Sequence, residues 1–150
     1  MFKTIVKWLI LSRGALTIAF LDAKIETENF MSATLQQFIE QVQQSPECIE
    51  FDQTMQMISE NYDYSPTRFT NGEGEAMVIN EAGTNEGSCK IFAFAQLQAL
   101  SVQQTLALFG QFYRHDVLQH PQATDHANIR NFMKSGWVGI HFDQPALALK

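Results

Sequence analysis

The sequence predicts an α+β fold: a single small domain in which four or five helices pack on a small sheet. Three observations indicate this class. Apolar residues recur with helical spacing in several stretches, three short runs are rich in β-branched and aromatic residues, and no internal repeat or low-complexity linker divides the chain of 150 residues. The sequence leaves open how the strands pair and whether the sheet curls towards a barrel.

The first two helices follow from apolar stripes on either side of Pro46. Apolar residues within 35–42 recur at i, i+3, i+4 and i+7, which predicts a helix capped by Ser32 or Thr34. This helix should end at Pro46, because proline cannot continue a helix interior. A second stripe of the same kind predicts a helix from about Asp52 to Asn61.

A hairpin is expected next. Pro66 disfavours a helix, and the aromatic and β-branched residues around it predict an extended segment over about 64–70. Asn71-Gly72 is a tight-turn signal, and a second strand is expected over about 77–80. The acidic residues 73–75 would then lie in the hairpin loop.

The most apolar part of the chain predicts two buried helices in succession. Residues 91–100 are apolar nearly all round and rich in helix formers, which favours a buried helix. Ser101 followed by Gln104 forms a capping box, so a further helix should start there. Its apolar stripe continues to Tyr113, which predicts a largely buried helix of about three turns.

The C-terminal part predicts a helix and a final strand. Thr124 or Asp125 caps the helix, and Gly136 lies just past its end, where a left-handed backbone favours glycine. Residues 138–142 alternate in hydrophobicity, which predicts a strand. Residues 146–150 are interpreted as a tail.

The first thirty residues are interpreted as an extension outside the fold. Their apolar region loosely resembles a signal peptide, but Arg13 and a glycine split it and no A-x-A cleavage site follows. No uninterrupted run is long enough to cross a bilayer. We therefore expect a domain over 31–145 with Met31-Ser32 as its natural start, and a signal anchor at residues 1–30 as the alternative.

Charge and cysteine content narrow the classes of partner. The net charge is −6, and from Met31 onward six basic residues stand against thirteen acidic ones. Such a domain repels phosphate backbones, so we expect no nucleic-acid partner. Cys48 and Cys89 do not make a disulfide framework, which favours a reducing, cytoplasmic interior.

Cys89 is the candidate nucleophile. It should lie at the start of the buried helix, where a helix N-terminus lowers a thiol pKa. A base would have to come from a histidine distant in sequence. The alternative, which we favour, is that Cys89 is a small buried residue that fills a close helix contact.

Three histidines and two aspartates fall within a dozen residues: His115, Asp116, His120, Asp125 and His126. Their spacing matches no zinc motif such as H-E-x-x-H, so no metal is expected. Asp125 is more simply a helix N-cap with His126 as its first-turn neighbour. The functional alternative is a carboxylate–imidazole pair that lines a pocket, with His126 and His115 as candidate proton-transfer groups.

Polar residues near the apolar block must find hydrogen-bond partners or stay solvated. We expect the loop from Asn80 to Ser88 to lie against the N-terminal half of the last helix, and Arg130 to contact a carboxylate or carbonyl of that loop. This arrangement could be a structural network or a pocket floor that includes Cys89 and His126. The candidate binding residues are Asn80, Glu81, Asn85, Asp125, Arg130 and Asn131.

Four motifs follow one another between about Leu35 and Phe142: FTNG, NEAGTNEGSCKIFAFAQLQ, QTLALFGQFYRHDVLQHP and TDHANIRNFMKSGW. In their sequence and their order these motifs resemble the HopJ family of type III effector proteins. The resemblance implies delivery into a host cell and implies no defined chemistry.

Two classes of function follow. The favoured hypothesis is a binding or interaction domain with a protein partner and no cofactor, because no strong catalytic motif is present. The alternative is a small thiol-dependent hydrolase or transferase that uses Cys89 with a histidine.

Overall fold

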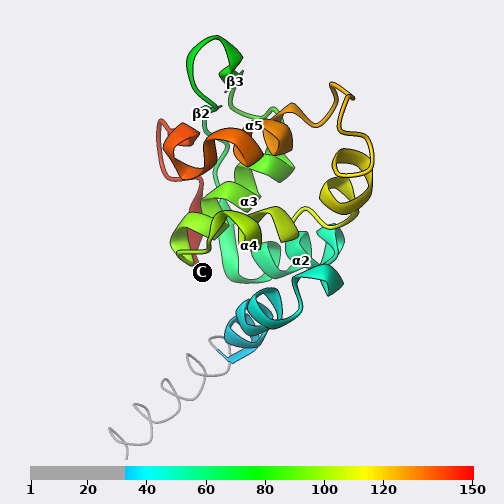
Figure 1. Ribbon diagram of the computed structural model, residues 1–150. Coiled ribbons are helices and arrows are strands. Elements are labelled where there is room, and N and C mark those ends of the chain that lie inside the picture. The colour runs from blue at the N-terminus through cyan, green and yellow to red at the C-terminus, as the bar shows by residue number, and fades with distance from the viewer. Residues whose placement is uncertain (1–32) are drawn as a thin grey trace, which may run out of the picture. The chain divides into compact units, whose positions relative to one another are not determined.

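The computed structural model describes residues 33–150, which are coloured in Figure 1. The chain divides into two units, Met1–Gln36 and Gln37–Lys150. The expectations about residues 1–30, the start at Met31 and the cap at Ser32 lie outside the described residues. Residues 33–44 are helical and end before Pro46, as the apolar stripe predicts, and Phe38 and Val42 of this helix are buried.

The second unit has the α+β composition that the sequence predicts. Its principal helices are α2 (Phe51–Asn61), α3 (Glu86–Leu97), α4 (Val102–Ala107) and α5 (Ala127–Ser135). Further helical segments of 3₁₀ or π type are η1 (Pro46–Cys48), η2 (Gly74–Ala76), η3 (Phe112–Val117) and η4 (Gly136–Gly139). The strands are β1 (Tyr62–Tyr64), β2 (Phe69–Asn71), β3 (Val78–Asn80), β4 (His141–Phe142) and β5 (Leu147–Leu149).

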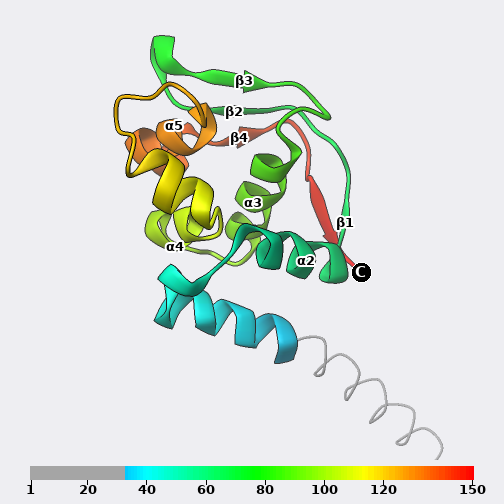
Figure 2. The same ribbon diagram turned by 90° about the vertical axis from the view of Figure 1, so that its right-hand side faces the viewer.

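The three regions predicted to be extended contribute β2, β3 and β4 to one antiparallel sheet with the order β3-β2-β4. The run expected over about 64–70 is divided, because Tyr64 belongs to β1 and β2 begins at Phe69. Phe69 lies opposite Asn80 in β3 and opposite Phe142 in β4, which fixes the register of the central strand. The hairpin over Asn71-Gly72 is therefore confirmed. Figure 2 shows the three strands side by side, with α3 and α5 on one side of the sheet.

A second sheet was not expected. Strand β1 pairs with β5 in antiparallel orientation, with Tyr62 opposite Leu149. The prediction that residues 146–150 are a tail is therefore wrong, because Leu147–Leu149 form a strand and Ala146 and Leu147 are buried. Over residues 33–150 the two sheets stay separate, and the strands do not close into a barrel.

Helix α3 is the centre of the core, as its apolar composition predicts. Residues 91–95 are all buried, which leaves this helix without a solvent-facing side over that length. The ring of Phe92 contacts three other aromatic rings, those of Phe69, Phe109 and Phe132. Because these rings come from β2, the segment after α4, and α5, one side chain joins the sheet to the helical part.

The helix after Ser101 is shorter than predicted. Its capping box is present, because the Ser101 side chain accepts from the Gln104 amide and the Gln104 side chain accepts from the Ser101 amide. The helix nevertheless ends at Ala107, and Gly110 has a φ of +55°. A Cβ at Gly110 would lie 2.5 Å from the Phe51 nitrogen, so the approach of α2 forces the chain to turn here.

The final strand is also shorter than predicted. The alternation over 138–142 predicts a strand, but Gly136–Gly139 form a 3₁₀ turn and the strand contains only His141 and Phe142. Packing explains the difference, because the Gly72 amide donates to the Gly139 carbonyl over 3.1 Å. A Cβ at Gly139 would lie 2.7 Å from the Gly72 nitrogen, so the two glycines allow the backbones to meet.

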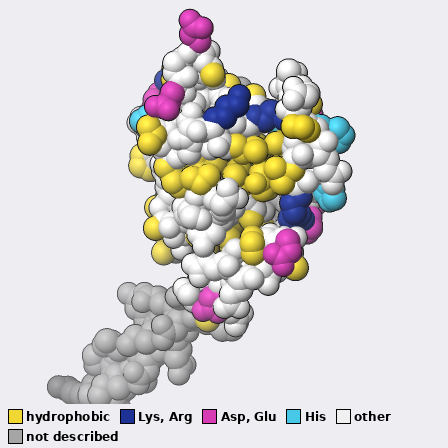
Figure 3. Space-filling model, viewed as in Figure 1, with side chains coloured by type: hydrophobic (Ala, Val, Ile, Leu, Met, Phe, Trp, Pro, Cys, Tyr) yellow, Lys and Arg dark blue, Asp and Glu magenta, His cyan; other side chains and the backbone are white. Residues whose placement is uncertain are grey.

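Figure 3 shows hydrophobic side chains gathered in a band across the junction of α4 and α5 on the face seen in Figure 1. Met133 of α5 is among the exposed large apolar residues, at 42%. Among residues 33–150, none of the helices has both the length and the apolar character that crossing a membrane requires.

Candidate functional site

A cleft of about 370 Å³ opens where α3 and α5 begin. One side is formed by Asn85, Gly87 and Ser88, and the other by residues 126–129. Apolar side chains complete the wall: Phe51, Val78, Phe109, Phe112 and Ile129. Three other clefts among the described residues have similar volumes, for example about 430 Å³ beside β5, but no histidine or cysteine lines these three.

Two helix N-termini meet at this cleft. The first intrahelical bonds run from the Cys89 amide to the Asn85 carbonyl, and from the Arg130 amide to the His126 carbonyl. The N–H groups of residues 86–88 and 127–129 therefore have no helix carbonyl to bind. Neither N-cap residue accepts a hydrogen bond with its side chain. The cleft thus presents backbone donors and the positive ends of two helix dipoles.

Both N-cap residues, Asn85 and His126, have a left-handed backbone, with φ of 48° and 51°. The prediction that Asp125 or Thr124 caps the last helix is therefore wrong, because the cap position falls at His126. The Asp125 side chain binds Arg130 instead of the helix amides. A histidine with a positive φ costs of the order of 1 kcal/mol, so the surrounding contacts must hold it.

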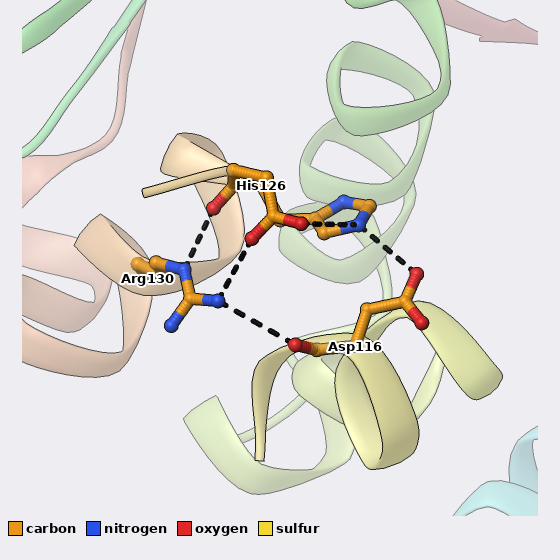
Figure 4. Close-up of polar contacts among 4 residues, drawn as sticks. Asp116, His126 and Arg130 are labelled. Atoms are coloured by element: carbon orange, nitrogen blue, oxygen red, sulfur yellow. Dashed lines mark hydrogen bonds and ion pairs between the residues drawn. The ribbon is translucent and has the colours of Figure 1, made fainter. Parts of the chain in front are cut away.

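His126 pairs with a carboxylate from another element. Its Nε2 atom lies 3.1 Å from Oδ2 of Asp116 in η3, and 3.9 Å from a carboxylate oxygen of Asp125. The imidazole also packs against the ring of Phe112, with centroids 5.5 Å apart. Figure 4 shows the imidazole directed towards the Asp116 carboxylate. The His126 side chain is 29% exposed and lines the cleft. A carboxylate–imidazole pair, the alternative that the sequence left open, is therefore present, with Asp116 as the carboxylate and His126 lining the cleft.

Arg130 holds the segment before α5 in place next to this pair. Its Nε donates to the Asp125 carbonyl over 2.7 Å, and its Nη2 donates to the Asp125 carboxylate over 2.9 Å. The hydrogen bond from Arg130 is the main reason that the pKa of Asp125 lies below its ordinary value. The prediction that Arg130 contacts the loop from Asn80 to Ser88 is wrong, because the guanidinium binds Asp125, which is nearer in sequence.

Asparagines join that loop to α5 instead. The Asn80 and Asn128 side chains exchange two hydrogen bonds, and the Asn85 side chain donates to Asn80 Oδ1 over 2.7 Å. Asn71 donates to the Asn128 carbonyl over 2.7 Å. The loop therefore lies against the N-terminal half of α5, as predicted. The network places Asn85 and Asn128 at the cleft and leaves them little freedom to move.

Cys89 lies in the core. Its side chain is 1% exposed and its sulfur is 3.9 Å from the Thr67 carbonyl. Tyr64 lies beside the thiol, yet its hydroxyl has no partner with hydrogen-bonding geometry in the described part of the chain. Burial raises the pKa of Cys89 and of Tyr64. A buried thiol with a raised pKa is a poor nucleophile, so the geometry does not favour a thiol mechanism.

The remaining predicted residues lie outside the cleft lining. Glu81 is 3.5 Å from Arg68, and His115 makes a hydrogen bond with Gln119. Asn131 donates to the Asn71 and Ala76 carbonyls, which is a structural role in the hairpin. Within residues 33–150 no group of three or more His, Cys, Asp and Glu side chains is placed to hold a metal ion.

Sequence reasoning missed several groups that line the cleft. Ser88 lies in the first turn of α3 and faces residues from α5, but a serine after a glycine has no distinctive pattern. Phe51 and Phe112 form an edge-to-face pair across the cleft wall, with centroids 5.0 Å apart. Since they are 61 positions apart in sequence, only the fold brings them together.

Fold and cleft together define a small α+β domain with one polar, partly apolar recess between two helix N-termini. The comparisons identify its family. A model of the HopJ type III effector protein family matches residues 35–147, and the chain belongs to this family.

One solved structure is similar to this chain over most of the length of both chains. It is the crystal structure of VPA0580, a protein of unknown function, which shares 55% sequence identity with this chain. The match covers 77% of this chain and 92% of that one, with a TM-score of 0.73. No curated protein matches the sequence.

Proposed function

We propose that this HopJ family member is a binding domain that recognises a protein partner through the cleft between α3 and α5. The observation that carries the proposal is the meeting of two uncapped helix N-termini in one recess. Backbone N–H groups there need acceptors, and the aromatic wall needs an apolar neighbour. The group that suits both is an apolar side chain or chain end that carries a carbonyl or carboxylate oxygen.

The rigidity of the cleft supports a binding function. The asparagine network fixes the loop before α3 to α5, and Arg130 fixes the segment before α5. A site whose groups are held before the ligand arrives loses less conformational entropy on binding. The cleft volume of about 370 Å³ accommodates one side chain or a chain end, so the rest of a partner would lie on the surrounding surface.

We also propose that the domain acts in a cytoplasm, either that of the producing cell or, as the family name implies, that of a host cell after secretion. Two unpaired cysteines support a reducing compartment. A secretion reporter fused to this chain and assayed in cells with and without a functional type III apparatus tests the second location. Export that does not depend on the apparatus would argue against it.

The binding site is tested with two matched variants. Ala127 lies at the cleft and is exposed, so Ala127→Phe fills the recess without entering the core. Ala123→Phe places the same side chain on an exposed position away from the cleft. A photo-crosslinking amino acid at position 127 should capture a partner that the same group at position 123 does not. Equal capture at both positions would contradict the site.

A fragment titration tests the ligand chemistry. N-acetylleucine carries an apolar side chain and a carboxylate, whereas N-acetylleucine amide lacks the charge. In ¹⁵N spectra the first should shift the amide signals of Gly87, Ser88 and Asn128 more strongly, because the helix N-termini favour an anion. Ala127→Phe should abolish these shifts and Ala123→Phe should retain them. Shifts that occur only outside α3 and α5 would contradict the proposal.

A further inference from the structure

His126 is arranged as a base. An ionised carboxylate only accepts hydrogen bonds, so the contact between Asp116 Oδ2 and His126 Nε2 places the ring proton on Nε2. The lone pair of a neutral imidazole is then on Nδ1. Among the hydrogen bonds of residues 33–150, none engages this Nδ1 atom. The free nitrogen therefore belongs to a residue that lines the cleft.

Ser88 lines the same cleft and has an unengaged hydroxyl. The hydroxyls of Thr54, Ser59 and Thr105 within helices donate to a carbonyl three or four residues earlier. The Ser88 hydroxyl makes no such bond, nor any other with the described residues, although the residue is half-buried in α3. A serine in the first turn of a helix also lies among backbone N–H groups that have no helix partner.

Space beside Ser88 is bounded by aromatic rings. A Cβ at Gly87 would lie 3.0 Å from the Phe51 ring, so the glycine lets this ring pack directly against the start of α3. With Phe112 at its edge, the ring forms an apolar wall next to the hydroxyl. Such a wall suits a short apolar acyl chain.

We propose that the cleft is an acyl-hydrolase site for small esters with a short apolar acyl group. Ser88 is the nucleophile and His126 is the general base, so these two are the catalytic residues. Asp116 is a positioning residue that holds the imidazole tautomer. This inference rests on ligand binding at the cleft, as proposed above, and adds a reaction to it.

The reaction needs water as its only co-reactant. The Ser88 oxygen attacks the ester carbonyl carbon while its proton passes to His126 Nδ1, directly or through one water molecule. The tetrahedral oxyanion is stabilised by N–H groups in the first turn of α3. The intermediate expels the alkoxide, which takes the proton from His126, and leaves an acyl group on Ser88. Water, deprotonated by His126, then releases the carboxylic acid and restores the serine.

The charges around the imidazole suit this role. Asp116 and Asp125 lie 3.1 and 3.9 Å from Nε2, so two carboxylates stabilise the imidazolium that forms during attack. Arg130 neutralises Asp125 from the other side at 2.9 Å and keeps that carboxylate in place. The pair therefore resembles the orienting part of a serine-hydrolase triad, with ring nitrogens used in the opposite order.

Labelling with a fluorophosphonate probe tests the nucleophile. The parent protein should gain the mass of one phosphonyl group, and Ser88→Ala should gain none. Ser59→Ala, which changes an exposed serine on α2, is the matched control and should label like the parent. An unlabelled parent protein, or an adduct that persists in Ser88→Ala, would overturn the assignment.

Hydrolysis of p-nitrophenyl butyrate tests the base and its positioning residue. Ser88→Ala and His126→Gln should each lower kcat by about a hundredfold or more. Asp116→Asn should lower kcat with little change in KM, because the amide disturbs the tautomer and not the acyl pocket, and Asp116→Glu should restore part of the rate. Unfolding midpoints within 2–3 °C or so of the parent exclude loss of fold.

Hydrolysis that does not depend on His126 would overturn the mechanism. The N-acetylleucine titration separates the two proposals. Shifts of the cleft amide signals without labelling or hydrolysis would overturn the acyl-hydrolase proposal and leave the binding proposal standing. The absence of both these shifts and labelling would overturn both proposals.

Discussion

Asn80 and Asn128 exchange two hydrogen bonds between their side-chain amides, at 3.1 and 2.8 Å, although 48 positions separate them in sequence. Both residues are buried, and Asn71 donates to the same Asn128 oxygen over 3.1 Å. This reciprocal pair attaches the end of the β2–β3 hairpin to the first turn of α5. It therefore fixes one side of the cleft relative to the other.

Removing one member should destabilise the domain. Asn128→Ala leaves the Asn80 amide without its acceptor and removes one of the two acceptors of the Asn71 amide, so we expect a loss of about 1–3 kcal/mol in the free energy of unfolding. Urea unfolding measures it. Gln122→Ala, at an exposed loop position, is the control and should change stability by less than about 0.5 kcal/mol. An Asn128→Ala protein as stable as the control would show that the network is not structural.

The contact between Arg130 and Asp125 should make stability depend on pH. The pKa of Asp125 is lowered in the folded protein, so the pair stabilises the native state above the ordinary carboxyl pKa of 3.8. This contribution is lost as the pH falls from there through the lowered folded value. Arg130→Ala should thus lower the urea midpoint of unfolding at pH 6. In acid, below the lowered pKa of Asp125, the midpoint of the variant should approach that of the parent.

Lys134→Ala is the matched control for this experiment, because it also removes one positive charge from α5 but changes an exposed side chain. Its difference from the parent should stay small at both pH values. If Arg130→Ala differs from the parent equally at pH 6 and in acid, the carboxylate of Asp125 is not the group through which the arginine stabilises the fold.

The two cysteines should differ sharply in reactivity. Cys48 is exposed, whereas Cys89 is buried with a raised pKa, and the thiolate is the reactive form. With Ellman's reagent at pH 8, one thiol should react at once and the other at least about a hundredfold more slowly, until urea unfolds the chain. Cys89→Ser should keep the fast phase and Cys48→Ser should remove it. A fast phase that survives in Cys48→Ser would return Cys89 to consideration as a nucleophile.

Two glycines with positive φ give a matched test of close packing. Gly110→Ala introduces a Cβ 2.5 Å from the Phe51 backbone nitrogen, in addition to the strain of a φ of +55°. Gly83→Ala introduces similar strain at a φ of +83° with nothing within 4 Å. We expect a loss of about 1–2 kcal/mol for Gly83→Ala and roughly 2–4 kcal/mol for Gly110→Ala, measured by urea unfolding. Equal losses would mean that the backbone contact between residue 110 and α2 relaxes freely.

Local signals in the sequence were sufficient for much of the fold. Residues 91–95 are apolar on all sides, and a helix with no polar face must be buried. The Ser101–Gln104 capping box and the Asn71-Gly72 turn each involve neighbours within a few positions, so their chemistry is readable from the chain alone. The resemblance of four motifs to the HopJ family is also a property of the sequence, and the family model confirms it.

Other elements depend on contacts between distant segments. The helical stripe to Tyr113 is interrupted at Gly110 because Phe51 approaches there, and no local rule reports the position of α2. Strand β5 forms because β1 offers it hydrogen bonds, although the two are more than 80 positions apart in sequence. Arg130 binds Asp125 because the chain brings that nearer carboxylate within reach before any group of the 80–88 loop.

The sequence by itself determined that an apolar helix between two polar loops forms the core, and it offered Cys89 and the histidines as candidate reactive groups. Tertiary structure alone decided which of them meet. It buried Cys89, paired His126 with Asp116, and placed Ser88 in the same cleft as that pair. The physical reason is that hydrophobic periodicity specifies which face of an element is buried, whereas the neighbours of a polar side chain depend on how all elements pack together.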